Sequence, residues 1–157
     1  FNQVFVRLSI SNYNISDFFS SKNYQYKYQN FSENILLITN KTSRFSLDYS
    51  FKSKNVSEEE VDLTLHEIGV ELDREISAKS NFQSHCKYIN IDYSGSNNSI
   101  LNYELTEGLS SGNNFVWGII YTNKLKNKLQ INLQYSGRKS EMSKIKHIGN
   151  MGITAYF

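Results

Sequence analysis

The sequence contains no proline and only one cysteine, Cys86, among its 157 residues. A lone cysteine cannot form an internal disulfide, so the chain is not a disulfide-stabilised scaffold. Because no residue is proline, every residue can donate its backbone N–H, as the strands of a closed sheet must. No apolar run reaches the roughly 20 residues that a transmembrane helix needs. The net charge of +2 is too small to indicate a nucleic-acid partner.

Sequence motifs of catalysis and metal binding are also missing. No serine or cysteine lies in a nucleophile-elbow context, and the glycines form no phosphate-binding loop. The three histidines, His66, His85 and His147, are scattered and lack the spacing of metal ligands. We therefore expect no catalytic site, no metal and no cofactor, and we predict that the chain is not an enzyme.

Aromatic residues are plentiful, and apolar and polar residues alternate with period two. One example places Leu129, Ile131, Leu133 and Tyr135 on one face of a strand and glutamine, asparagine or serine on the other. The run from Arg44 to Phe51 alternates in the same way. The pattern predicts about eight strands, at roughly 2–11, 24–38, 43–53, 64–76, 82–94, 114–125, 128–138 and 145–157.

The stretch around residues 57–72 allows two interpretations. Ser57 followed by three glutamates resembles the start of a helix. However, Val61 to Leu65 alternate in one parity and Ile68 to Leu72 in the other, which favours two strand pieces joined by a bulge or bend near His66.

The connections between the predicted strands differ in length. Three are short, at 39–42, 77–81 and 126–128, whereas the others, at 12–23, 54–63, 95–113 and 139–144, are longer and polar. Short turns at one end and long loops at the other are typical of an outer-membrane barrel. We predict an all-β, antiparallel up-and-down transmembrane barrel over residues 1–157. It would be either complete with eight strands or the closing part of a larger barrel.

The difference between the two faces of these strands predicts that one contacts lipid and the other lines a lumen. We expect Phe115, Ile131 and Leu133 to face lipid. The opposite face carries charges that suit a polar lumen, and a tight hairpin centred on Lys79 would set Asp73 opposite His85 and Glu71 opposite Lys87. The predicted lumen network comprises Glu71, Asp73, His85, Lys87 and Arg44.

The C-terminal third carries a family resemblance. The chain ends on an alternating strand with Gly152, Ala155 and a terminal Phe157, which resembles the signal read by the barrel-assembly machinery. Upstream, a Gly-Leu-x-x-Gly-x-Asn segment from Gly108 precedes Trp117, and Gly137-Arg138-Lys139 precedes the last strand. These motifs resemble the C-terminal region of outer-membrane β-barrel proteins of the Bacteroidota. The resemblance implies location and architecture, and it implies no catalytic residue.

The favoured function is therefore an integral outer-membrane barrel that anchors, or forms part of, a surface, secretion or transport assembly. Its expected partners are outer-membrane lipid, the assembly machinery during biogenesis and other surface proteins. Phe157 and the short turns are predicted on the periplasmic side, with residues 138–144 and 95–113 outside the cell. A soluble lipocalin-like barrel with its apolar face inward is the alternative, and an outer-membrane enzyme is less favoured.

Overall fold

The computed structural model describes residues 3–19, 22–40, 42–56, 61–95, 103, 105–126, 129–141 and 143–155. These residues form eight strands in one sheet: β1 (Gln3–Phe19), β2 (Lys22–Asn40), β3 (Ser43–Val56), β4 (Val61–Ser77), β5 (Ser80–Ser94), β6 (Gly112–Lys126), β7 (Leu129–Ser140) and β8 (Lys146–Ala155). No helix in this part of the chain is long and apolar enough to cross a membrane.

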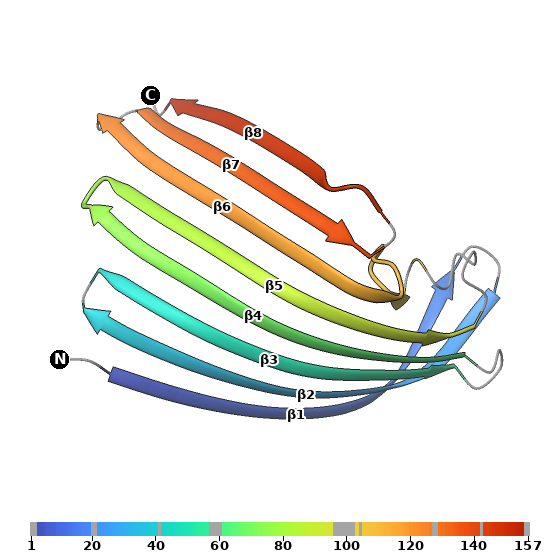
Figure 1. The fold of residues 1–157 in the computed structure, drawn as a ribbon. Coiled ribbons are helices and arrows are strands. Elements are labelled where there is room, and N and C mark those ends of the chain that lie inside the picture. The colour runs from blue at the N-terminus through green and yellow to red at the C-terminus, as the bar shows by residue number, and fades with distance from the viewer. Residues whose placement is uncertain are drawn as a thin grey trace.

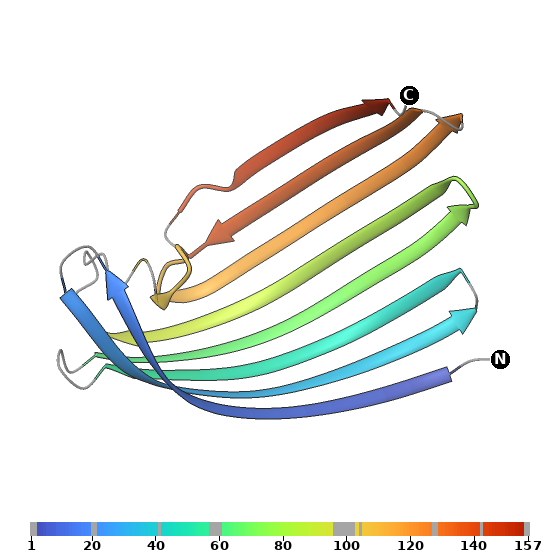
Figure 2. The ribbon, with the colours of Figure 1, turned by 180° about the vertical axis from the view of Figure 1, so that it is seen from behind.

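Each strand pairs antiparallel with its neighbour in sequence, so that the sheet order is β1 to β8 without a crossover. The sheet is curved, and β1 and β8 lie at its two opposite edges (Figure 1). The reverse view shows the same sheet with the two edges well apart (Figure 2). Within the described residues, β1 and β8 each pair on one side only. The predicted all-β, antiparallel eight-strand architecture is confirmed.

The strands extend beyond their predicted ends where the sequence is polar. Residues 12–19 and 22–23 were expected in a loop, but β1 and β2 pair as far as Phe19 and Lys22. Likewise, β3 and β4 pair as far as Val56 and Val61 inside a stretch predicted as a loop. Backbone pairing needs no apolar side chain, so a polar hairpin can continue a ladder past the apolar band. Side-chain alternation therefore underestimates the length of these strands.

Strand β4 shows that the predicted bend near His66 was wrong. Its pairing with β3 runs without interruption from Val61 to Arg74. Its pairing with β5 is equally regular until a register shift between Glu75 and Ser77, close to the turn. The side chains of a regular strand keep alternating between the faces. The change of parity in the sequence is therefore a change in the chemistry of each face, from apolar to polar on one face and the reverse on the other.

The two faces of the sheet differ in composition. One face, called the convex face here, carries large apolar side chains that are exposed in the structure, including Phe45, Leu47, Ile68, Phe115 and Leu133. The opposite, concave face carries most of the charged residues of β3 to β5 and the amides of β7. The apolar side chains that are buried gather at one end of the concave face. This distribution resembles neither a soluble sandwich nor a barrel with an apolar interior.

Candidate functional site

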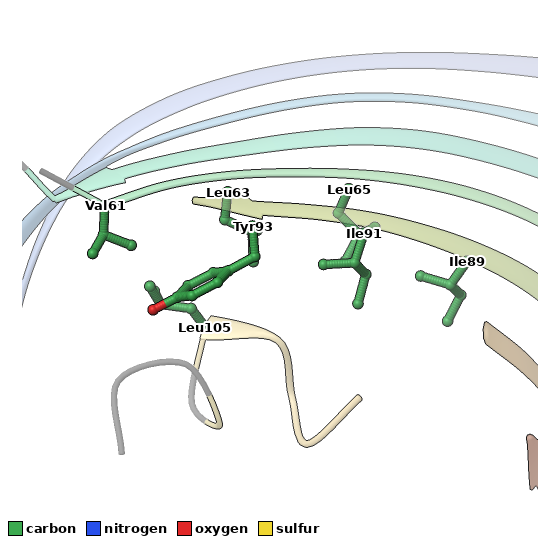
Figure 3. Packing of buried hydrophobic residues seen from close by; sticks show 7 residues of the cluster. All are labelled: Val61, Leu63, Leu65, Ile89, Ile91, Tyr93 and Leu105. Carbon is green, nitrogen blue, oxygen red and sulfur yellow. The ribbon is translucent and has the colours of Figure 1, made fainter. Parts of the chain in front are cut away.

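The candidate site is the concave face of β4 and β5 together with the segment that precedes β6. At the end of the sheet near the 95–111 connection, seven apolar side chains form the buried core: Val61, Leu63, Leu65, Ile89, Ile91, Tyr93 and Leu105. Six of them come from β4 and β5, and they point to the side of the sheet on which Leu105 lies (Figure 3). Leu63 is completely buried, and Leu105 is 2% exposed. The segment at 105–111 therefore folds inward and covers this end of the concave face.

Polar contacts hold the inward segment in place. The Lys54 ammonium donates a hydrogen bond to the backbone carbonyl of Leu105, at 3.1 Å. The Ser111 hydroxyl donates to the carbonyl of Ile91, at 3.2 Å. The buried Asn114 amide donates to the carbonyls of Ser110 and Gly112, at 2.8 and 3.1 Å. Contacts from three different strands therefore tie the segment to the sheet.

One tight turn shapes the same segment. Glu107 and Gly108 both have left-handed backbone conformations, with φ of 57° and 73°. Such a pair reverses the chain within a few residues, and glycine adopts this conformation without steric cost. The turn is closed by hydrogen bonds from the Gly108 N–H to the Tyr103 carbonyl and from the Leu109 N–H to the Thr106 carbonyl. The reversal delivers Leu105 to the sheet.

Sequence reasoning missed this covered region, although a signal was present. Val61, Leu63 and Leu65 share a face with Glu67 and Glu71, because all five are odd-numbered positions of one regular strand. Apolar residues on an otherwise charged face indicate that something covers them. That signal was interpreted as a bend in the strand.

The five predicted lumen residues lie on the same concave face, but their pairing differs from the prediction. Glu71 is opposite His85, not Lys87, and Asp73 is opposite Gln83 and Arg44. Two causes move the register by two residues. The turn contains two residues, Ala78 and Lys79, and one extra residue, Ile76, lies at the register shift.

Lys87 forms its ion pair with Glu67, which the prediction did not include. The Lys87 ammonium and a Glu67 carboxylate oxygen are 2.7 Å apart, with the two side chains 45% and 17% exposed. Across the neighbouring strands, the Asn34 amide and the Ser46 hydroxyl donate to the Asp48 carboxylate. A continuous polar surface therefore extends over β2 to β5 next to the apolar, covered end.

His85 occupies a special position in this polar surface. A Cβ atom on Gly118, directly opposite on β6, would overlap the imidazole ring of His85. The ring therefore lies against Gly118, where only glycine leaves space for it. Among the described residues, no group of three or more His, Cys, Asp or Glu side chains could hold a metal ion.

The predicted assembly signal is described only in part. Gly152 and Ala155 lie in the edge strand β8, opposite Asn132 and Leu129 of β7. Phe157 lies outside the described residues. The role of these residues as a signal stays a prediction.

The fold as a whole is similar to a solved structure. This structure is OmpTdeltaL8, a loop L8 deletion mutant of OmpT, an outer membrane protein of Vibrio cholerae. The TM-score is 0.67 at 10% sequence identity, and the match covers 98% of this chain and 49% of that chain. This chain therefore spans about half the length of the structure it matches. No protein-family model matches the sequence, and no curated protein matches it significantly. The likeness shows that the chain has the fold of an outer-membrane β-barrel protein.

The comparison also corrects the prediction that the chain is not an enzyme. That prediction rested on missing sequence motifs alone. The match to the OmpT structure counts against it, and the fold of a protein does not by itself separate enzymes from non-enzymes. We therefore no longer exclude an enzymatic activity for this chain.

Proposed function

We propose that the chain forms the wall of an integral outer-membrane β-barrel that anchors, or belongs to, a surface, secretion or transport assembly. The convex face contacts lipid, and the concave face lines an aqueous lumen. The observation that carries this proposal is the separation of the two faces, with large apolar side chains exposed on one and charged side chains on the other. Membrane barrels alternate in this way, apolar outward and polar inward.

The lipocalin-like alternative requires the opposite arrangement. A soluble ligand-binding barrel has an apolar interior and a polar exterior. Here the concave face carries Glu67, Glu71, Asp73 and Lys87, and the convex side chains of Ile68 and Phe115 are 49% and 44% exposed. In water these convex side chains would leave apolar surface exposed on neighbouring strands, and soluble monomers rarely expose large contiguous patches of this kind. Lipid accounts for it directly.

The inward segment at 105–111 would narrow the lumen at one end. It covers the apolar half of β4 and β5 and leaves the charged half open toward the other end. Solutes that cross would meet Lys54, Glu67 and Lys87 beside this constriction. The charged rim favours polar solutes over apolar ones, which fits a role in transport rather than in lipid storage.

The outer edges of β1 and β8 need backbone partners if the sheet lies in a membrane. Backbone groups facing lipid without a partner each cost several kcal/mol. We propose that the eight strands form a barrel, or a contiguous part of one, in which the outer edges of β1 and β8 are paired. The residues 1–157 would then act as one barrel unit.

Cysteine labelling tests the assignment of the faces. In a Cys86→Ser background, single cysteines replace Leu133 on the convex face and Gln134 on the concave face. In outer-membrane vesicles, a membrane-impermeant maleimide should label the cysteine at position 134 and leave the one at position 133 unlabelled. A lipid-soluble maleimide should label the cysteine at position 133. The reverse result would assign the convex face to a water-exposed surface and overturn the proposal.

Fractionation tests the location and the assembly signal. The full chain should be recovered with outer membranes and show heat-modifiable migration on a gel. Deletion of Phe157 should lower its amount in the outer membrane while export to the periplasm continues. Equal outer-membrane levels with and without Phe157 would show that the terminal aromatic residue is not a recognition signal.

A further inference from the structure

A groove crosses the convex face along β5. Its floor consists of two small side chains, Ser84 and Cys86, and its walls are larger apolar side chains from β3, β4 and β6. The volume is about 280 Å³. The convex side chains that line it are Phe45, Val70, Leu72, Ser84, Cys86, Trp117 and Ile119. The groove opens on the face that the proposed function assigns to lipid.

The position of Trp117 keeps the groove open. Trp117 lies opposite Cys86 of β5 on one side and opposite Gly137 of β7 on the other. A Cβ atom on Gly137 would overlap the indole ring, so the ring lies over β7 and away from the groove. Its edge-on contact with His147 of β8, with ring centroids 6.3 Å apart, shows the same direction. The Trp117 ring therefore occupies the space that a side chain at position 137 would fill.

Arg74 lies on the same convex face, one position beyond the groove along β4. Arg74 follows Leu72 on β4, two residues closer to the short turn at Ala78 and Lys79, and shares its convex face. Its side chain is exposed. Guanidinium groups bind phosphate oxygens with paired hydrogen bonds. An apolar groove that leads to an arginine matches a lipid that carries a phosphate above an acyl chain.

We infer that this groove binds one phospholipid, with an acyl chain along Ser84 and Cys86 and the phosphate at Arg74. The inference rests on the proposed function, because it requires the convex face to lie in a membrane. The groove volume is at the small end of ligand pockets and fits part of one chain rather than a whole drug-sized ligand. The site would hold a lipid at a fixed position on an otherwise unspecific surface.

Native mass spectrometry of the full chain tests the site. The protein is extracted from outer membranes in a mild detergent and titrated with dioleoylphosphatidylethanolamine. Wild type should retain one lipid per chain. Cys86→Leu fills the floor of the groove and should lower the affinity for the lipid about tenfold, which corresponds to roughly 1.4 kcal/mol. Arg74→Gln should weaken it by a smaller factor, since the acyl contacts remain.

Matched variants separate volume from chemistry. Cys86→Ser keeps the floor small and should bind as wild type does. Ile153→Leu changes a convex residue of β8 outside the groove and should also have no effect. Gly137→Ala should push the Trp117 ring toward the groove and reduce binding, with a shift in the emission of this single tryptophan.

The outcomes separate failure of the lipid site from failure of the membrane location. Equal lipid retention in wild type, Cys86→Leu and Arg74→Gln would overturn the site while leaving the membrane location intact. Retention of lipopolysaccharide in place of the phospholipid would also overturn it. Recovery of wild type in the soluble fraction would contradict the proposed function itself. If Cys86→Leu and Gly137→Ala both fail to assemble, the exposed Arg74→Gln still decides whether the phosphate is bound there.

Discussion

The two halves of β4 and β5 share one sheet and one concave face but differ in chemistry. Near the inward segment, Leu63 and Ile91 are buried in an apolar cluster. Toward the short turn, the same face carries Glu71 and His85. The strand geometry is equally regular in both halves, so backbone structure does not account for the difference. The difference follows the covering segment, since apolar residues occur where 105–111 excludes water and charged residues where nothing in the described chain covers the sheet.

The largest effect is expected in the covered half. Leu63→Ala should lower the free energy of unfolding by about 2–5 kcal/mol, because a fully buried leucine leaves a cavity. Glu71→Gln in the open half should change it by less than about 0.5 kcal/mol. Denaturant midpoints in detergent measure both variants. Similar losses for the two variants would show that the halves do not differ in packing.

The next prediction compares the two faces instead of the two halves. Leu133→Arg, on the convex side of β7, should cost about 2–4 kcal/mol if the residue lies near the bilayer midplane. Gln134→Arg, the adjacent residue on the concave side, should cost far less if this face lines a hydrated lumen, as proposed. Folding into lipid vesicles, followed by heat-modifiable migration, measures both. A costly Gln134→Arg with a harmless Leu133→Arg would exchange the faces.

The attachment of the covering segment can be weakened without touching the apolar cluster. Lys54→Met removes the ammonium that donates to the Leu105 carbonyl and should cost about 1–3 kcal/mol locally. The segment should then be cut faster by proteases in the folded protein. Lys52→Met, at the next concave position of β3, serves as the control. Unchanged cleavage in Lys54→Met would mean that the Leu105 packing and the Ser111 and Asn114 hydrogen bonds hold the segment without Lys54.

The smallest effect is expected in the open half, at the Lys87–Glu67 pair. Its ammonium and carboxylate are 2.7 Å apart, but the lysine side chain is nearly half exposed. A double-mutant cycle with Lys87→Met and Glu67→Gln should give a coupling below about 1 kcal/mol, decreasing as salt is added. A coupling of several kcal/mol would indicate that this half is also shielded from water.

Much of the fold could be predicted from the residues themselves. The alternation of β3 and β7, exemplified by Phe45 and Leu133, is a local property that each strand carries independently of its neighbours. The register of β4 and β5 could not be predicted to the residue, because one extra residue at Ile76 and a two-residue turn moved every pair. A shift of this kind leaves the faces unchanged but changes which charges meet, so that Lys87 pairs with Glu67.

The sequence alone determined the strand number, the antiparallel order and the shared face of the five predicted lumen residues. These properties follow from the period of the strand and from the short connections, which act over a few residues. Only the tertiary structure decided that Leu105 covers Leu63 and Ile91, and that Trp117 leans over Gly137 and leaves a groove beside Cys86. Those contacts join residues from different strands, and their geometry depends on the space left by every side chain around them.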